Sequence, residues 1–240
     1  MHMEFYTLGH SDALEYAVQA LKANGWIECA QAKIFILPVP SFESDGSIKG
    51  GGTIVEIPKD ALVIGGKLSA LQKENFQTFD LLEHPLYLSE NAAITAYCAL
   101  QIAMEKLPIT LHNCNALVIG WGRIGKCLVR LLRLLGAKVT VAARKEPDRA
   151  LLEALGYSTT DLADSFDPSQ FRVIFNTADA PVLPISKQSN CRKDCVKIDL
   201  SSAGGIEGND VIWARGLPNK FAPESSGELM AKVILKEVSK

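Results

Sequence analysis

The chain has 240 residues, of which 48% are hydrophobic and 22% charged, so it has enough apolar material for globular cores and for one or two domains. Its net charge of −2 gives no reason to expect nucleic acid or an anionic membrane as a partner. No apolar run reaches the length of a membrane span, and the amino terminus lacks a signal-peptide pattern, so we expect a cytoplasmic protein.

The cysteines and histidines do not indicate a metal site. The six cysteines are scattered without a Cys-x-x-Cys pair, and the four histidines do not cluster with acidic residues. We therefore expect reduced thiols and no metal.

Strand and helix patterns alternate over residues 1–88. This predicts a small, truncated flavodoxin-like α/β domain that binds the substrate or a partner. Strands are expected at 3–8, 33–37 and 61–64, with a helix from Ser11 to a stop at Gly25. The segment 41–53 is rich in glycine and serine, so we expect a flexible loop with Ser41 in solvent.

A bridging helix is expected over 89–106, with Ser89 as its N-cap and Glu90 in its first turn. Glu90 is a candidate acid or base. A surface carboxylate that compensates the helix dipole is an equal alternative.

Residues 115–125 read Asn-Ala-Leu-Val-Ile-Gly-Trp-Gly-Arg-Ile-Gly, an apolar strand that ends in Gly120-x-Gly122-x-x-Gly125. A helical pattern follows, then Gly136 at a C-cap position and a strand over 138–144. This arrangement predicts an NAD(P)-binding Rossmann domain over 89–223. Gly120 permits the turn, Gly122 lets the backbone approach a pyrophosphate, and Gly125 lets helix and strand pack closely.

The residues around this loop suggest which dinucleotide binds. Arg144 and Lys145 stand where an NAD site usually has a carboxylate for the ribose, so we predict NADP, with NAD as the alternative. Arg123 and Ile124 lie within the loop, where Arg123 either covers the pyrophosphate or is an exposed surface arginine.

Polar residues end two later strands, at 173–177 and 196–201, where ligands bind in open α/β sheets. We expect Asn176 and Thr177 under the nicotinamide ribose. Asp199 and Ser201 would position the nicotinamide amide or the substrate, or Asp199 would satisfy local backbone donors instead.

Ser225-x-x-Glu228 reads as a capping box that opens a last helix, over 224–240, which we expect to cross back and complete the first domain. Ser225 would bind a substrate carboxylate or act as a plain N-cap.

Several segments together resemble the family of the dipicolinate synthase A chain, and more distantly the NAD(P)-binding domains of D-2-hydroxyacid dehydrogenases and adenosylhomocysteinase. They are Leu88-Ser-Glu-Asn91, Gly120-Trp-Gly-Arg-Ile-Gly125, Val141-Ala-Ala-Arg144, Phe175-Asn-Thr177, Ile198-Asp-Leu-Ser-Ser202 and Gly216-Leu-Pro-x-x-x-Ala-Pro-x-Ser-x-Gly227. The resemblance implies oxidation of a dihydropicolinate-type cyclic dicarboxylate to dipicolinate with NADP, beside a flavoprotein second subunit, during sporulation. We also expect a homo-oligomer.

The chain departs from the family at Ala178-Asp179, where we expect Ile-Pro, and at Ser202-Ala203-Gly204-Gly205, where an arginine is missing. No histidine follows His112, which disfavours the histidine-based mechanism of D-2-hydroxyacid dehydrogenases. The sequence thus leaves three functions open: this oxidoreductase, a related dehydrogenase with another substrate, and a non-catalytic NAD(P)-binding subunit or sensor.

Overall fold

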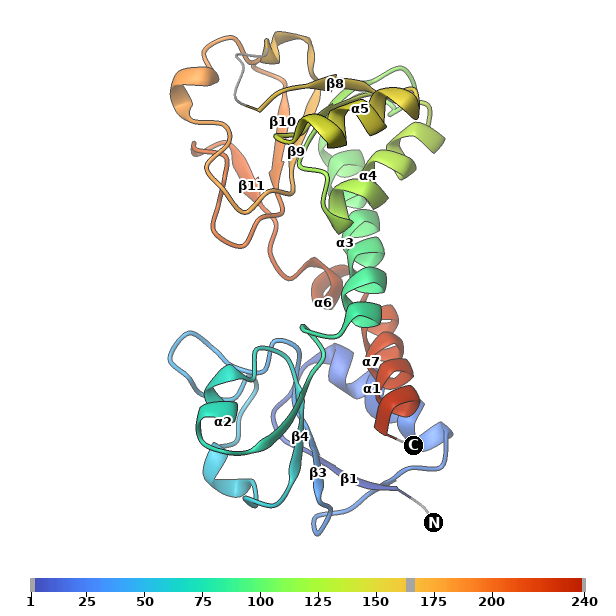
Figure 1. Ribbon diagram of the computed structural model, residues 1–240, viewed down its shortest axis with the longest axis vertical. Coiled ribbons are helices and arrows are strands. Elements are labelled where there is room, and N and C mark those ends of the chain that lie inside the picture. The colour runs from blue at the N-terminus through green and yellow to red at the C-terminus, as the bar shows by residue number, and fades with distance from the viewer. Residues whose placement is uncertain (1–2, 163–166, 239–240) are drawn as a thin grey trace. The chain divides into compact units, whose positions relative to one another are not determined.

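A computed structural model describes residues 3–162 and 167–238. The chain divides into two compact units (Figure 1). Unit 1 comprises Met1–Ile94 and Pro218–Lys240, and unit 2 comprises Thr95–Leu217. Each unit contains one parallel sheet with helices, so the predicted two-domain α/β fold is confirmed.

Unit 1 has a five-stranded parallel sheet in the order β2-β1-β3-β4-β5. Its strands are β1 (Glu4–Thr7), β2 (Ile27–Glu28), β3 (Ile34–Ile36), β4 (Leu62–Gly65) and β5 (Gln77–Asp80). This is the strand order of flavodoxin. All five strands are present, and the reduced parts are the connections: β3 and β4 are joined through only a 3-10 turn (Ile54–Glu56), and α2 (Ser69–Lys73) is short.

Helix α1 (Asp12–Ala23) begins where the sequence predicts, because the Ser11 hydroxyl accepts a hydrogen bond from the Leu14 N–H at 3.2 Å. The C-terminal helix α7 (Pro223–Val238) packs against it. The core between the sheet and these helices is shared by both ends of the sequence. It includes Phe5, Leu14, Leu21, Leu229, Met230, Val233 and Ile234.

Unit 2 has a six-stranded parallel sheet in the order β11-β10-β9-β6-β7-β8. The strands are β6 (Asn115–Ile119), β7 (Lys138–Ala142), β8 (Ser158–Thr160), β9 (Val173–Asn176), β10 (Val196–Asp199) and β11 (Val211–Trp213). Counted within the unit, this is the Rossmann order 3-2-1-4-5-6, with its switch point between β6 and β9. Its helices include α4 (Arg123–Leu134) and α5 (Glu146–Ala154).

Two predicted helix starts are wrong. Helix α3 spans Pro85–Lys106, and Ser89 donates its hydroxyl to the Pro85 carbonyl at 2.8 Å inside the helix instead of capping it. Helix α7 begins at Pro223, so Ser225 lies within its first turn and the capping box does not form. In both cases a proline, whose fixed φ suits the first helical position, starts the helix earlier. The predicted end of α7 at 239–240 lies outside the described residues.

The prediction of a solvated Ser41 is also wrong, because its side chain is fully buried. Its hydroxyl donates to the Pro38 carbonyl at 2.8 Å and accepts from the Gly66 N–H at 2.9 Å, which joins the ends of β3 and β4. The rest of this loop is also tied down, because the His10 N–H donates to the Lys49 carbonyl at 2.9 Å and Phe42 pairs with Ile48.

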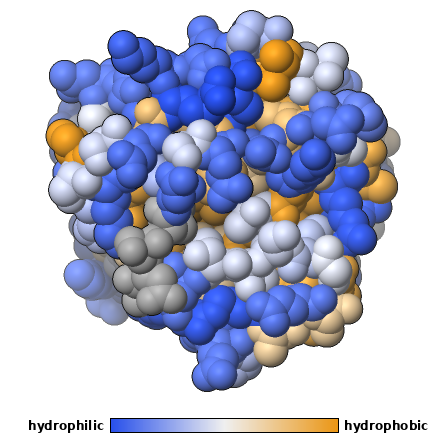
Figure 2. All heavy atoms as spheres, turned by 90° about the horizontal axis from the view of Figure 1, so that it is seen from above, coloured by the Kyte–Doolittle hydropathy of each residue, from blue (hydrophilic) through white to orange (hydrophobic). Residues whose placement is uncertain are grey.

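Figure 2 shows the end of unit 2 that carries β8 and α5, where the surface is mostly hydrophilic and apolar residues are scattered. Within the part of the chain that the structure describes, no helix is both long and apolar enough to cross a membrane.

Candidate functional site

The glycine loop follows β6 at the carboxyl end of the unit 2 sheet. Gly120 has a φ of +102°, and a Cβ there would lie 2.6 Å from the Thr177 hydroxyl oxygen. A Cβ on Gly125 would lie 2.3 Å from the Gly120 carbonyl oxygen, so neither position accepts a side chain. At Gly122, by contrast, a Cβ would meet nothing within 4 Å, which leaves this stretch of backbone open to a ligand.

Helix α4 starts directly after Gly122, so Arg123, Ile124 and Gly125 form its first turn. The first N–H groups of a helix have no partner within it and carry partial positive charge, which suits a pyrophosphate. No acidic side chain occupies this turn. The buried indole Nε1 of Trp121 has no hydrogen-bond partner among the described residues, so an unmet donor lies beside the open backbone.

A cavity of about 700 Å³ adjoins this loop. Its wall combines the glycine loop with residues that follow β7, β8 and β9. They are Gly120, Trp121, Gly122, Ala143, Arg144, Lys145, Asp148, Leu162, Ala178, Asp179, Ala180, Pro181, Val182, Pro184 and Lys187. The cavity thus has an apolar part and a charged part, as expected for a site that holds a nucleotide.

Three cationic side chains line the cavity: Arg144, Lys145 and Lys187. All three are exposed, and within the described residues none makes a side-chain hydrogen bond or ion pair. Of the two carboxylates in the wall, Asp179 already accepts the Ser202 N–H at 2.7 Å and its hydroxyl at 2.8 Å. With three cations against two carboxylates, the net charge of the wall is positive and favours an anionic ligand.

The polar residues that end β9 and β10 bind one another. Asn176 is fully buried, donates to the Asp199 carboxylate at 2.9 Å and to the Ala178 carbonyl at 3.1 Å, and accepts the Ala178 N–H at 3.0 Å. The Thr177 hydroxyl donates to the Ile119 carbonyl at 2.9 Å. The Ser201 hydroxyl accepts the Gly204 N–H at 3.0 Å.

Asp199 is the centre of this network. One carboxylate oxygen accepts the Asn176 amide and the Ser201 N–H, and the other accepts the N–H groups of Gly205 and Ile206 at 2.6 and 2.8 Å. Burial by itself raises the pKa of Asp199, but the hydrogen bonds from Ser201, Gly205 and Ile206 outweigh it and leave the pKa below its usual value. The geometry matches the second alternative from the sequence, in which Asp199 satisfies local backbone donors.

Two further candidates, Glu90 and Ser225, belong to unit 1. Lys232 of α7 donates to both Glu90 carboxylate oxygens, at 2.7 and 2.9 Å. Glu90 lies inside α3 and not in its first turn, which removes the dipole-compensating role. Ser225 is exposed in the first turn of α7.

Sequence patterns missed Trp121, Asp179 and Lys187 as parts of the cavity wall. Trp121 carries a signal, because it stands between two glycines of the fingerprint. Lys187 carries none, since its place depends on how the loop after β9 folds.

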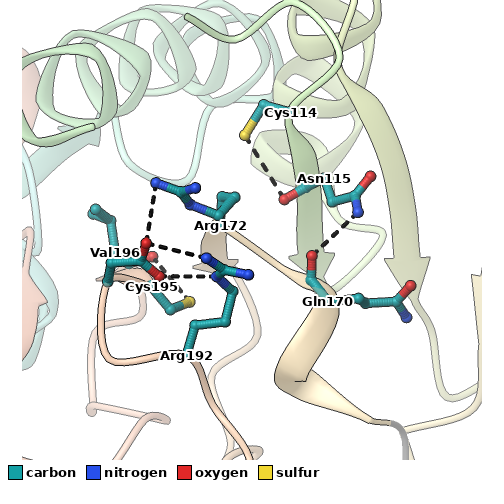
Figure 3. A network of polar contacts seen from close by, with 8 residues as sticks. Cys114, Asn115, Gln170, Arg172, Arg192, Cys195 and Val196 are labelled. Atoms are coloured by element: carbon teal, nitrogen blue, oxygen red, sulfur yellow. Dashed lines mark hydrogen bonds and ion pairs between the residues drawn. The ribbon is translucent and has the colours of Figure 1, made fainter. Parts of the chain in front are cut away.

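The opposite, amino end of this sheet carries an ion-pair network (Figure 3). Arg192 donates to Asp194 with two nitrogens, at 2.9 and 3.2 Å, and Arg172 lies 3.3 Å from the same carboxylate. The hydrogen bond from Arg192 holds the pKa of Asp194 below its usual value. This network ties the loop before β10 to the start of β9 and lies away from the cavity. Among the described residues, no three His, Cys, Asp or Glu side chains are grouped to hold a metal ion.

Known proteins share both the sequence pattern and the fold, although no protein-family model matches the chain. The dipicolinate synthase A chain of Bacillus subtilis (strain 168) is 26% identical over an alignment of 157 residues, and the match covers 61% of this chain and 52% of that protein. The chain resembles the dipicolinate synthase A chain. The aligned part spans about half the length of this curated relative.

The solved structures extend the likeness to the whole fold. The dipicolinate synthase A chain from Bacillus halodurans superimposes with a TM-score of 0.86 at 21% identity, over 99% of this chain and 98% of that one. The solved A chain of dipicolinate synthase from Bacillus subtilis gives 0.85 at 19% identity, over 100% and 96%. D-lactate dehydrogenase from Salmonella shares the fold at a TM-score of 0.63 and 14% identity, over 99% and 97%.

Proposed function

We propose that the chain binds NADP in the cavity of unit 2 and oxidises a dihydropicolinate-type cyclic dicarboxylate to dipicolinate. The observation that carries this proposal is the positive, unpaired charge of Arg144 and Lys145 in the same cavity as the open backbone at Gly122. The resemblance to the dipicolinate synthase A chain supports the substrate class.

Each part of the wall has a separate task. The N–H groups at the start of α4 bind the pyrophosphate, and Arg144 and Lys145 bind the 2′-phosphate, for which a guanidinium is well suited. When bound, the nicotinamide would accept a hydride from the substrate ring. Asn176 and Asp199 are positioning residues, because their hydrogen bonds hold residues 178 and 205–206.

Glu90 and Ser225 are our candidates for the substrate side, as an acid or base and as a ligand of a substrate carboxylate. Glu90 would exchange its ion pair with Lys232 for contact with substrate. From the same resemblance we propose a flavoprotein as second subunit. We also propose self-association of the chain and a cytoplasmic location.

Calorimetric titration of NADP and NAD tests the cofactor assignment. We expect wild type to prefer NADP, and Arg144→Gln to weaken NADP binding about tenfold while NAD binding changes little, because only NADP carries the 2′-phosphate. Arg130→Gln is the matched control, since Arg130 is exposed on α4 and does not line the cavity. Tighter binding of NAD by wild type would contradict the assignment.

A second candidate function is a non-catalytic NADP-binding subunit or sensor. One observation favours it: the polar side chains at the ends of β9 and β10 already form hydrogen bonds within the chain. They are Asn176, Thr177, Asp199 and Ser201. Formation of NADPH from the dihydropicolinate-type precursor, assayed with and without the flavoprotein, separates the two. Tight NADP binding without turnover in either assay would favour the sensor.

A further inference from the structure

Lys187 lies on a short 3-10 turn (Ile185–Lys187) that enters the cavity wall from the loop after β9. The turn is anchored on both sides. Before it, Leu183 pairs with Ile206, and the Ile185 N–H donates to the Glu207 carboxylate at 3.1 Å. After it, the Gln188 amide donates to the Leu183 carbonyl at 2.9 Å. These contacts fix the backbone from which the Lys187 side chain extends.

The neighbouring carboxylates that the structure describes do not form an ion pair with Lys187. The nearby Lys197 is only 5% exposed, and its amine binds Asp210 at 2.6 Å and the side-chain carbonyl oxygen of Gln188 at 2.9 Å. Glu207 is engaged by the Ile185 N–H, and Asp179 by Ser202. The amine of Lys187 has no such partner within the described residues. It therefore adds to the positive charge that Arg144 and Lys145 bring to the same cavity wall.

The other lining residues indicate which part of the dinucleotide lies in the cavity that Lys187 shares. Residues that follow the second Rossmann strand, here Arg144 and Lys145, contact the adenosine ribose in this fold. Leu162, Val182 and Pro184 supply apolar surface to the same cavity, which suits the adenine ring.

On the basis of the proposed NADP site, we infer that Lys187 is a further specificity-determining contact for the 2′-phosphate, supplied by a different loop from Arg144 and Lys145. The phosphate is then held by two loops of the cavity wall, one after β7 and one after β9. Its charge is neutralised by residues that are far apart in sequence.

Binding of NADP and NAD to wild type, Lys187→Met and Lys193→Met by calorimetry tests this inference without any turnover. Both substitutions remove one positive charge from an exposed site, but only Lys187 lines the cavity. We expect Lys187→Met to weaken NADP binding about fivefold or more and NAD binding less than about twofold, because an exposed ion pair of this kind is worth about 1 kcal/mol. Lys193→Met should leave both unchanged, and Lys187→Arg should restore NADP binding.

Three results would overturn the inference. Equal weakening of NADP and NAD by Lys187→Met would place the lysine against the pyrophosphate, which both dinucleotides share. Unchanged NADP binding would exclude a contact. After either of these two results, the proposed function still stands if wild type prefers NADP and Arg144→Gln weakens NADP binding. Only the role of Lys187 then fails. A wild type without preference for NADP would overturn both, and thermal unfolding of each variant checks that it is folded.

Discussion

A single buried carboxylate, Asp199, holds together the connections that border the cavity. Its four donors come from β9 and from the loop that follows β10, so its charge is balanced by amide groups and not by a cation. A carboxylate in this setting stabilises the fold only while every donor has its acceptor, because an unmatched buried donor costs free energy.

Asp199→Asn is therefore expected to lower the free energy of unfolding by about 2–4 kcal/mol. The new amide nitrogen would face N–H groups that it cannot accept. Urea unfolding followed by tryptophan fluorescence measures the loss. The control is Asp179→Asn, since the exposed Asp179 accepts hydrogen bonds only from Ser202 among the described residues. A change below about 0.5 kcal/mol would contradict the assigned role.

The same group predicts how stability depends on pH. Because hydrogen bonds keep the pKa of Asp199 below its usual value of 3.8, its contribution is present above that value. The contribution is lost as the pH falls through the lower folded-state pKa. The difference between wild type and Asp199→Asn should thus be constant from pH 7 to pH 5 and shrink below about pH 4.

Individual residues also show which features the sequence alone predicts and which it does not. The roles of Gly120 and Gly125 follow from their spacing, because each is a local demand of one turn. The sequence does not predict the burial of Ser41 or the position of Lys187 in the cavity wall. Both depend on loops that pack against strands distant in the sequence. The helical spacing of Leu128, Leu131 and Leu135 after Ile124 predicts that these leucines can face the sheet. The side chain of Leu135 is nevertheless 43% exposed, because α4 ends at Leu134.

At the scale of elements, α1 and α7 approach each other closely at Gly227. A Cβ at this position would lie 2.4 Å from the Ala13 carbonyl oxygen and 2.7 Å from the Ala17 nitrogen. These are backbone atoms of α1, which cannot move aside as a flexible side chain would. Close packing of the two helices thus requires a glycine in the first half of α7.

Gly227→Ala should destabilise the protein by about 1–3 kcal/mol, although alanine usually favours a helix by about 1 kcal/mol over glycine. The helices must separate to admit the methyl group. Ser225→Ala in the same turn is the control, since its side chain is exposed and its replacement should change stability by less than about 0.5 kcal/mol. The measurement is the urea concentration at the unfolding midpoint of wild type and of both variants. A Gly227→Ala variant more stable than wild type would refute the packing argument.

Element boundaries are harder to predict from this sequence than element types. The long, periodic helices and apolar strands can be found, whereas edge strands such as β2 and β11 are missed because two or three residues are too few to show a strand period. The starts of α3 and α7 are misplaced for a physical reason: Ser89 and Ser225 imitate caps, but a preceding proline already starts the helix.

At the scale of the whole molecule, unit 1 is built from both ends of the sequence and unit 2 from the middle. The buried side chains of Leu229, Met230, Val233 and Ile234 belong to the core of unit 1. At about 1.5–3 kcal/mol each, their burial contributes as much as the entire net stability of a typical domain.

Removal of residues 218–240 should therefore unfold unit 1 and leave unit 2 folded. Limited proteolysis with mass spectrometry of the fragments is the measurement, with rapid cleavage expected within residues 3–84 and protection within 115–213. Removal of residues 239–240 alone serves as control. Equal protection of both regions in the shortened chain would show that α7 is dispensable.

The pairing of α1 with α7 also sets an order of events during synthesis. Every strand of unit 2 leaves the ribosome before α7 exists, so the nucleotide-binding unit is able to fold while α1 still lacks its partner helix. Until then, the side of α1 that packs against α7 stays uncovered on the nascent chain. That side of the early helix is consequently open to aggregation until the last helix of the unit has been made.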